Sequence, residues 1–103
     1  MKALVRSPRF EAWFRGLGDR AKQVILARLT RVEQGNFGDC RSVGDGVREL
    51  RIDVGPGYRV YFVRRGPAVY LLLTGGNKGS QKRDIDQAKA MARELKEEGG
   101  DAG

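Results

Sequence analysis

The chain has 103 residues and a net charge of +7, from 20 Lys and Arg against 13 Asp and Glu. This length builds one domain with one modest core, and no apolar run approaches the 18 residues that a membrane span requires. Histidine is absent and Cys40 is the only cysteine, which excludes His-based triads, His or Cys metal sites and an intrachain disulfide. We therefore expect no metal or cofactor. With an N-terminus that lacks the apolar stretch of a signal peptide, we also expect a cytoplasmic location.

The first third of the chain predicts a short strand over residues 2–6 and two helices. Ser7 is placed to cap the first helix and Pro8 to occupy its first position. Asp19 is placed to cap the second helix, and Gly35 to end it. Apolar residues recur at helical spacing in both segments: Phe10, Trp13, Phe14 and Leu17, then Ala21, Val24, Ile25, Leu29 and Val32. We interpret both stripes as core.

The middle of the chain predicts a loop followed by a hairpin. Residues 35–46 contain four glycines and predict a mobile connection. Strands over 47–54 and 58–65 flank a turn at Gly55-Pro56-Gly57. A symmetric hairpin pairs Val54 with Tyr58, Ile52 with Val60 and Leu50 with Phe62 on an apolar face. The other face then pairs Asp53 with Arg59, Arg51 with Tyr61 and Glu49 with Val63. A slip of one residue would exchange the two faces.

The last third predicts a strand and a helix. Residues 68–74 (AVYLLLT) are apolar on both faces, as in a central strand, and residues 75–79 leave that strand. Ser80 is placed to cap the final helix, whose apolar stripe is Ile85, Ala88, Met91, Ala92 and Leu95. Residues 97–103 are expected to be a frayed tail. The fold class is therefore α/β (α+β): a strand, two helices, a three-stranded antiparallel meander and a C-terminal helix in a single domain over residues 1–103.

Positive charge is concentrated between residues 47 and 83, which hold eight Lys and Arg and two acids. Such a face suits an anionic polymer, although a solvated face that only aids solubility has the same composition. Lys82 and Arg83 fall in the first turn of the last helix, where the dipole disfavours cations by roughly 0.3–1 kcal/mol each. This placement indicates a bound anion, unless Asp84 and Asp86 simply offset the two charges.

Three segments together resemble the RelE/ParE toxin superfamily, and most closely its HigB-type branch of addiction module killer proteins. They are LARLTRVEQGNFGD at 26–39, VGDGVRELRIDVGPGYRVYFVRRG at 43–66 and LLLTGGNKGSQKRDIDQAKAMARELK at 72–96. The resemblance implies a compact α/β fold and a cognate small antitoxin. For RelE-like and HigB-like members it also implies ribosome-dependent endoribonuclease activity on mRNA.

Family roles transfer only to matching residues. Arg59 matches the family arginine that contacts the scissile phosphate, and Arg51 lies on the preceding strand, where members carry site residues. Lys78 and Lys82 lie near the position at which others place a catalytic Tyr or His, but this chain has neither between Gly75 and Asp84. The candidate catalytic residues are Arg59, Lys82, Arg51 and Lys78, and the candidate substrate-binding residues are Tyr61, Arg83 and Arg48. We expect Lys82 to contribute more than Lys78, because a helical turn is more rigid than a loop.

In such a reaction the RNA 2′-hydroxyl attacks its own adjacent phosphate, and the protein aligns the strand, neutralises charge and moves two protons. Arginine stays protonated, so the proton carriers must come from Lys82, Lys78, Tyr61, Glu49 and Asp53. Tyr61 could instead stack a splayed base, and Asp53 could pair with Arg59 in a purely structural contact. Two other functions stay open: a ParE-like inhibitor of DNA gyrase, and an inactive relative that only binds an antitoxin. The expected partners are the antitoxin, the ribosome and mRNA.

Overall fold

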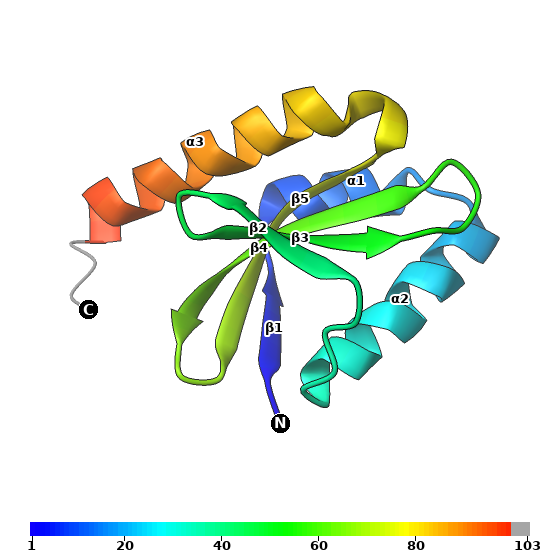
Figure 1. The fold of residues 1–103 in the computed structure, drawn as a ribbon, viewed down its shortest axis with the longest axis horizontal. Helices are drawn as coiled ribbons and strands as arrows, with labels where there is room; N and C mark the ends of the chain where they lie inside the picture. Colours follow the sequence, from blue (N-terminus) through cyan, green and yellow to red (C-terminus); the bar gives the residue numbers. More distant parts are fainter. Residues whose placement is uncertain (100–103) are drawn as a thin grey trace.

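The computed structural model describes residues 1–99, which fold into one five-stranded sheet, three α-helices and one 3₁₀ turn (Figure 1). The elements are β1 (Ala3–Arg6), α1 (Pro8–Arg15), α2 (Asp19–Glu33), β2 (Cys40–Gly44), β3 (Val47–Ile52), β4 (Tyr58–Gly66), β5 (Val69–Asn77), η1 (Lys78–Ser80) and α3 (Gln81–Gly99). The α+β fold class is confirmed. Residues 97–99 continue α3, so that part of the expected frayed tail is wrong, and residues 100–103 lie outside the described residues. No helix among residues 1–99 is long and apolar enough to cross a membrane.

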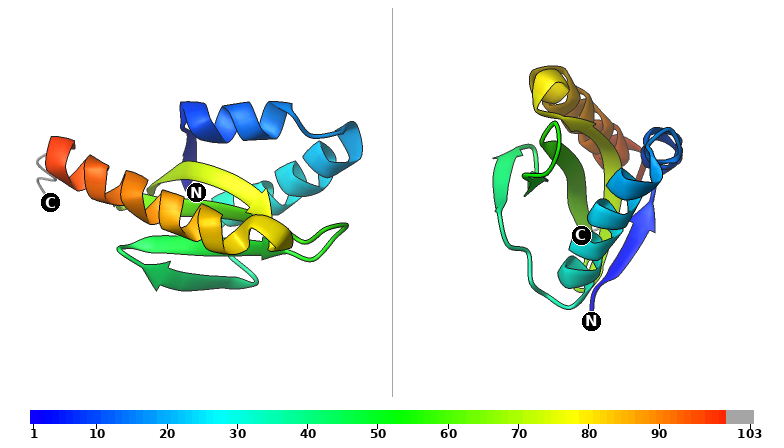
Figure 2. Two further views of the ribbon diagram at one scale, coloured as in Figure 1. Left: turned by 90° about the horizontal axis from the view of Figure 1, so that it is seen from above. Right: turned by 90° about the vertical axis from the view of Figure 1, so that its right-hand side faces the viewer.

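The strand order is β1-β5-β4-β3-β2, and every neighbouring pair is antiparallel except β1 and β5, which are parallel. Helices α1 and α2 cover one face of the sheet and α3 covers the other (Figure 2). Each face therefore has its own buried cluster. Against α1 and α2 lie apolar residues of β3, β4 and β5; against α3 lie Val47, Tyr61, Val63 and Leu73.

The first helix begins as its sequence indicates. Ser7 Oγ accepts a hydrogen bond from the Phe10 amide at 3.1 Å and donates to the Leu73 carbonyl at 2.8 Å, so the cap also ties the helix to β5. The second helix differs from its prediction: Gly18 is the N-cap, and Asp19 is the first helical residue and makes no capping bond.

The glycine-rich segment 35–46 is not simply a loop, because Cys40–Gly44 forms the edge strand β2 and pairs with β3. Its hairpin turn needs positive φ, which Gly44, Asp45 and Gly46 all adopt. Asp-Gly is a strong signal for such a turn, but the neighbouring glycines make the whole segment resemble a loop.

The β3–β4 hairpin is shifted by two residues from the predicted register. Ile52 pairs with Tyr58 and Leu50 with Val60, because residues 53–57 form a longer connection in which Gly55 and Gly57 have positive φ. A shift of two keeps every strand residue on its predicted face. Val54, however, leaves the strand and is 41% exposed, so its place on the apolar face is wrong.

Strand β5 continues through Gly75 and Gly76 to Asn77, although these residues were expected to leave the strand. The glycines allow close approach on both faces: a Cβ on Gly75 would collide with the Trp13 ring, and a Cβ on Gly76 with the Asp84 carboxylate. The longer β5 leads through η1 directly into α3.

Candidate functional site

The shifted register places Arg51 directly opposite Arg59, where the predicted register had put Asp53 opposite Arg59. Like charges directly opposite one another destabilise a sheet. Arg59 is also only 2% exposed. Among the described residues, the buried side-chain N and O atoms without a hydrogen-bond partner are the Nε atoms of these same two arginines. Each of the two guanidinium groups therefore keeps a buried donor that an anionic ligand would satisfy.

The acids near the arginine pair contact them only loosely. Arg59 Nη1 lies 3.5 Å from Asp53 Oδ1 and 3.4 Å from the Tyr58 carbonyl, and Arg51 Nε lies 3.9 Å from Asp39 Oδ2. The Asp53–Arg59 contact that we associated with a structural role is thus present. It involves an acid whose side chain is 76% exposed, and such pairs contribute little stability.

Beside the arginine pair, Glu49 is fully buried and accepts three hydrogen bonds. Arg41 Nε donates at 2.8 Å, the Tyr61 hydroxyl at 2.9 Å and Gln81 Nε2 at 2.8 Å. Burial alone would raise the pKa of the Glu49 carboxyl, but the bonds from Arg41, Gln81 and Tyr61 outweigh it and lower the pKa. Since Gln81 is the first residue of α3, this carboxylate fixes the start of that helix to β3.

Tyr61 does not present a face for base stacking. Its side chain is 0% exposed, and burial, followed by its bond to Glu49, raises the pKa of its hydroxyl. We expected Tyr61 to bind substrate or to transfer a proton, but α3 covers its ring and leaves no surface open to a base. Arg48, another residue that we expected to contact substrate, lies on the face of the sheet opposite Arg59. It pairs with Phe62, and its guanidinium stacks over the Phe37 ring at 5.6 Å.

A second buried acid lies above the end of β5. Asp84 is 4% exposed, accepts a hydrogen bond from Ser80 Oγ, and lies 3.7 Å from Arg83 Nε. Its carboxylate rests on Gly76, the cross-strand partner of Arg59. The sequence suggested Asp84 only as a charge that offsets its neighbours, whereas the structure places its carboxylate against Gly76, next to Arg59 on the neighbouring strand.

Lys78 lies closer to Arg59 than its position in sequence indicates. A Cβ on Gly57 would lie 3.4 Å from Lys78 Cβ and 3.9 Å from Arg59 Nη1, so the three residues are neighbours. Lys78 begins the 3₁₀ turn η1, in which Asn77 and Ser80 form a reciprocal capping box. The loop-flexibility argument for ranking Lys82 above Lys78 therefore no longer holds.

Lys82 and Arg83 are successive residues in the first turn of α3, about 100° apart around its axis, and both line a hollow with Ser80 and Asp86. Lys82 is seven residues before Lys89, hence on the same flank, and Lys89 Nζ approaches Gly44 at the β2–β3 turn. Arg83 lies on the flank that faces α1, together with Gln87.

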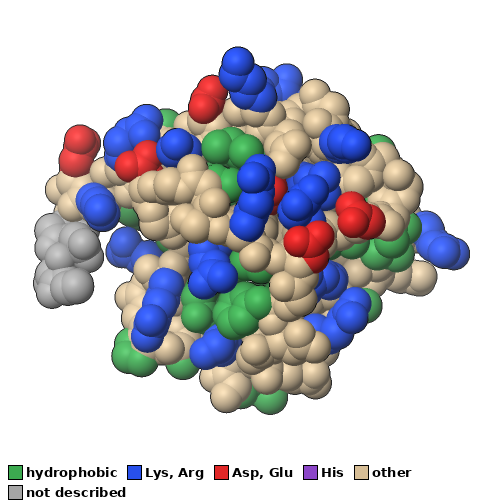
Figure 3. Space-filling model, in the orientation of Figure 1, with side chains coloured by type: hydrophobic (Ala, Val, Ile, Leu, Met, Phe, Trp, Pro, Cys, Tyr) green, Lys and Arg blue, Asp and Glu red, His purple; other side chains and the backbone are tan. Residues whose placement is uncertain are grey.

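Cations dominate one surface of the molecule. In the orientation of Figure 1, Lys and Arg side chains outnumber acidic ones on the visible face (Figure 3). Arg41 on β2 and Arg48 on β3 are among the exposed cations. Within residues 1–99, no group of three or more His, Cys, Asp or Glu side chains is arranged to hold a metal ion.

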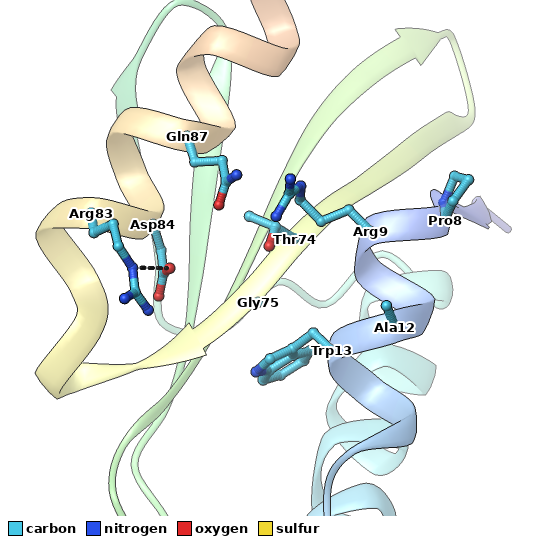
Figure 4. A pocket seen from close by; sticks show the side chains of 9 residues that line it. All are labelled: Pro8, Arg9, Ala12, Trp13, Thr74, Gly75, Arg83, Asp84 and Gln87. Carbon is cyan, nitrogen blue, oxygen red and sulfur yellow. Dashed lines mark ion pairs between the residues drawn. The ribbon is translucent and has the colours of Figure 1, made fainter.

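A separate cleft of about 800 Å³ lies between α1 and α3, above β5 (Figure 4). Its walls include Arg9 and Trp13 from α1 and Arg83, Asp84 and Gln87 from α3. No sequence motif singles out Arg9, and Trp13 was predicted to belong to the core. Trp13 packs against Phe10 but stays half-buried, unlike Phe10 and Phe14 on the same helix.

Comparison with known proteins identifies the class. A fold of this kind occurs in the intact E. coli RelBE toxin–antitoxin complex: one chain of that crystal structure matches with a TM-score of 0.61 and 15% identity, over 75% of this chain and 96% of that chain. The chain belongs to the family described as phage derived protein Gp49-like (DUF891), whose model matches residues 12–97, a family of RelE-like toxins. It is also 51% identical, over 87 residues, to an uncharacterized protein of Haemophilus influenzae strain Rd, which covers 84% of this chain and 88% of that relative. The resemblance to the RelE/ParE superfamily is confirmed.

Proposed function

We propose that this chain is the toxin of a type II toxin–antitoxin system, of the HigB-type branch, and that it cleaves mRNA on the ribosome. Membership of a RelE-like toxin family supports the general class. The observation that carries the activity is the Arg51–Arg59 pair, in which two cross-strand arginines each leave a buried Nε without a partner. A phosphodiester supplies the anionic oxygens that both guanidinium groups lack.

In the proposed reaction the RNA 2′-hydroxyl attacks the adjacent phosphorus and expels the 5′-oxygen of the next nucleotide. Arg59 and Arg51 neutralise the charge that develops on the phosphate oxygens. Asp84, held by Ser80, is our candidate to accept the 2′-hydroxyl proton, and Lys78, exposed beside Arg59, is our candidate to protonate the leaving oxygen. Because Arg59 is 2% exposed, the 53–57 connection must move and Asp53 must release the guanidinium before the phosphate reaches it.

The proposed partners are a small antitoxin and the ribosome with its mRNA. The solved complex of similar fold contains a toxin and an antitoxin, and the basic surface of this chain would attract an acidic or amphipathic antitoxin segment. Co-expression with small neighbouring reading frames tests this proposal, since the true antitoxin should suppress toxicity and co-purify. A steep fall of the association rate with salt would indicate binding over the basic surface, whereas a shallow one would indicate binding on the helical side.

Induction of the chain alone in growing cells, with mapping of mRNA 5′ ends, tests the activity. We expect new 5′ ends inside translated frames. Intact mRNA with stalled or broken DNA would instead support gyrase inhibition. Replacing Arg59 with Ala should abolish toxicity in a protein that still folds and still binds its antitoxin, because loss of one charge-stabilising group costs about 10²–10³ in rate. Undiminished toxicity of a well-expressed Arg59→Ala protein would remove Arg59 from the site.

A further inference from the structure

We infer that the cleft between α1 and α3 binds one nucleotide of single-stranded RNA, with its phosphate held by Arg9 and Arg83 and its base against Trp13. The inference rests on the proposed function, because it gives that RNA a second contact away from the Arg51–Arg59 pair.

The cleft has the size and floor that such a ligand requires. Its volume of about 800 Å³ falls within the range of small-molecule sites. Thr74 and Gly75 of β5 form the floor, and α1 and α3 form the walls (Figure 4). Any side chain at Gly75 would collide with the Trp13 ring. Glycine at this position therefore leaves room for the indole and keeps the floor of the cleft open.

Two arginines face the cleft from different helices and keep donors free. With the Gln87 amide oriented to satisfy both groups, its oxygen accepts from Arg9 Nη1 at 2.9 Å and Nη2 at 3.0 Å. A guanidinium has five N–H donors, so Arg9 retains donors for a phosphate. Arg83 contacts Asp84 through Nε at 3.7 Å, which leaves its two terminal nitrogens available, and its side chain is 80% exposed.

Trp13 supplies the aromatic surface that distinguishes a nucleotide from a simple anion. It lies one helical turn after Arg9 and is half-buried, so part of its ring stays accessible. Indole rings stack on bases without strong sequence preference, and arginines beside them bind the backbone. An acidic peptide would use the two arginines but would gain little from the indole.

The position of the cleft suits a continuous RNA strand. Gly75 in its floor precedes Gly76, the cross-strand partner of Arg59, and Asp84 both lines the cleft and rests on Gly76. A strand that places its scissile phosphate at Arg59 can therefore reach the cleft around the first turn of α3. We expect the cleft to fix the register of the RNA while the arginine pair does the chemistry.

A non-cleavable RNA tests the cleft directly. In a hexamer of 2′-O-methyladenosine the attacking hydroxyl is blocked, and Trp13 is the single tryptophan of the chain, so its fluorescence reports on the cleft alone. We expect the hexamer to quench Trp13 and inorganic phosphate at the same concentration to leave it unchanged. Arg9→Met and Arg83→Met should each weaken binding by about 10-fold and lower the salt slope by roughly 0.7. Arg15→Met, an exposed cation at the other end of α1, should change the affinity less than about twofold.

The stacking contact needs a second readout, because Trp13→Leu removes the fluorophore. Anisotropy of a labelled hexamer should show roughly 10-fold weaker binding to Trp13→Leu, at unchanged circular dichroism. Equal affinity of Trp13→Leu and the wild-type chain would overturn the assignment of the base to this ring.

Cleavage on programmed ribosomes separates failure of this inference from failure of the proposed function. Quenching by the hexamer with no cleavage of mRNA would overturn the function and keep the cleft. Cleavage of mRNA with wild-type hexamer binding by Arg9→Met and Arg83→Met would overturn the cleft and keep the function. If these two variants bind RNA normally but escape the antitoxin, the cleft belongs to a protein partner, and the inference is wrong.

Discussion

The two faces of the sheet are both buried, but they are buried by different chemistry. On β3, Leu50 faces α1 and α2 while its neighbour Glu49 faces α3, and both are 0% exposed. The cluster around Leu50 is formed by apolar and aromatic side chains. The α3 face has a smaller apolar cluster at one end, and at the other it buries Glu49, Arg59 and Asp84.

Because of this difference, the residues that stabilise the fold are not the ones that are available to bind a ligand. Burial of apolar area stabilises a fold, whereas burial of a charge costs free energy unless hydrogen bonds satisfy it. Glu49 is satisfied by three donors, but the Nε atoms of Arg51 and Arg59 have no partner. The α1/α2 face therefore holds the domain together, and the polar end of the α3 face retains the unsatisfied groups that a ligand can use.

The largest effect on stability should come from Glu49→Leu, which makes the α3 face as apolar as the other one. We expect a loss of about 3 kcal/mol in the free energy of unfolding, because the buried Tyr61 hydroxyl and the Gln81 amide lose their acceptor. Urea denaturation measures it. Glu11→Leu is the control, since its pair with Arg6 is partly exposed and worth less than about 1 kcal/mol. An unchanged or increased stability of Glu49→Leu would mean that the two faces are equivalent.

A methyl group at Gly76 should be the next most damaging change. Gly76→Ala forces the Asp84 carboxylate from its place, and overpacking of this kind costs about 1–3 kcal/mol. It should also slow mRNA cleavage, because Asp84 is displaced from the Arg59 strand pair. Gly66→Ala, where the nearest side-chain atom would lie at 4.0 Å, is the matched control and should leave cleavage unchanged. A Gly76→Ala protein that cleaves at the normal rate would remove Asp84 from the mechanism.

Low pH should destabilise the α3 face, which buries the Glu49 carboxylate, and not the apolar α1/α2 face. The pKa of Glu49 is lower in the folded chain than its ordinary value of 4.5, so its contribution is complete above pH 4.5 and is lost as pH falls toward the folded pKa. The slope contributed by this one proton cannot exceed about 1.4 kcal/mol per pH unit. Unfolding free energies measured between pH 6 and pH 3 should therefore decline more steeply for the wild-type chain than for Glu49→Leu. Parallel curves would show that Glu49 does not titrate as described.

The smallest effect should separate two buried tyrosines. Tyr61 on the α3 face donates to Glu49, whereas the Tyr70 hydroxyl on the other face makes no hydrogen bond within residues 1–99. Tyr61→Phe should cost about 1 kcal/mol and Tyr70→Phe close to nothing. Thermal unfolding of the two variants measures the difference, and equal losses would contradict the role of the Glu49 network.

Much of the fold follows from sequence because its signals are local. The helical stripes, the Ser7 cap and the face that each hairpin residue occupies are set by periodicity and short-range bonding. The exact register depends on the length of the 53–57 connection, and β2 depends on a turn hidden among glycines. Neither feature has a periodic signal.

The candidate site was only partly predictable for a different reason. Alternation shows that Tyr61 and Arg48 lie on opposite faces, but it does not show that α3 buries Tyr61 and that Phe37 engages Arg48. Asp84 acquires a role only because Gly76 lets its carboxylate approach β5. Arg9 and Trp13 meet Arg83 through tertiary packing, which spacing along α1 cannot reveal.

The rate of mRNA cleavage on programmed ribosomes, measured for three purified proteins, tests the central claim most directly. Arg59 and Arg64 lie on the same strand, but Arg59 is buried on the α3 face while Arg64 is exposed and contacts the Gly66 carbonyl. We expect the wild-type chain and Arg64→Met to cleave within about threefold of each other, and Arg59→Met to be slower by about 10²–10³. Absence of cleavage by the folded wild-type chain, or equal rates for the two variants, would contradict an mRNA-cleaving site centred on Arg59.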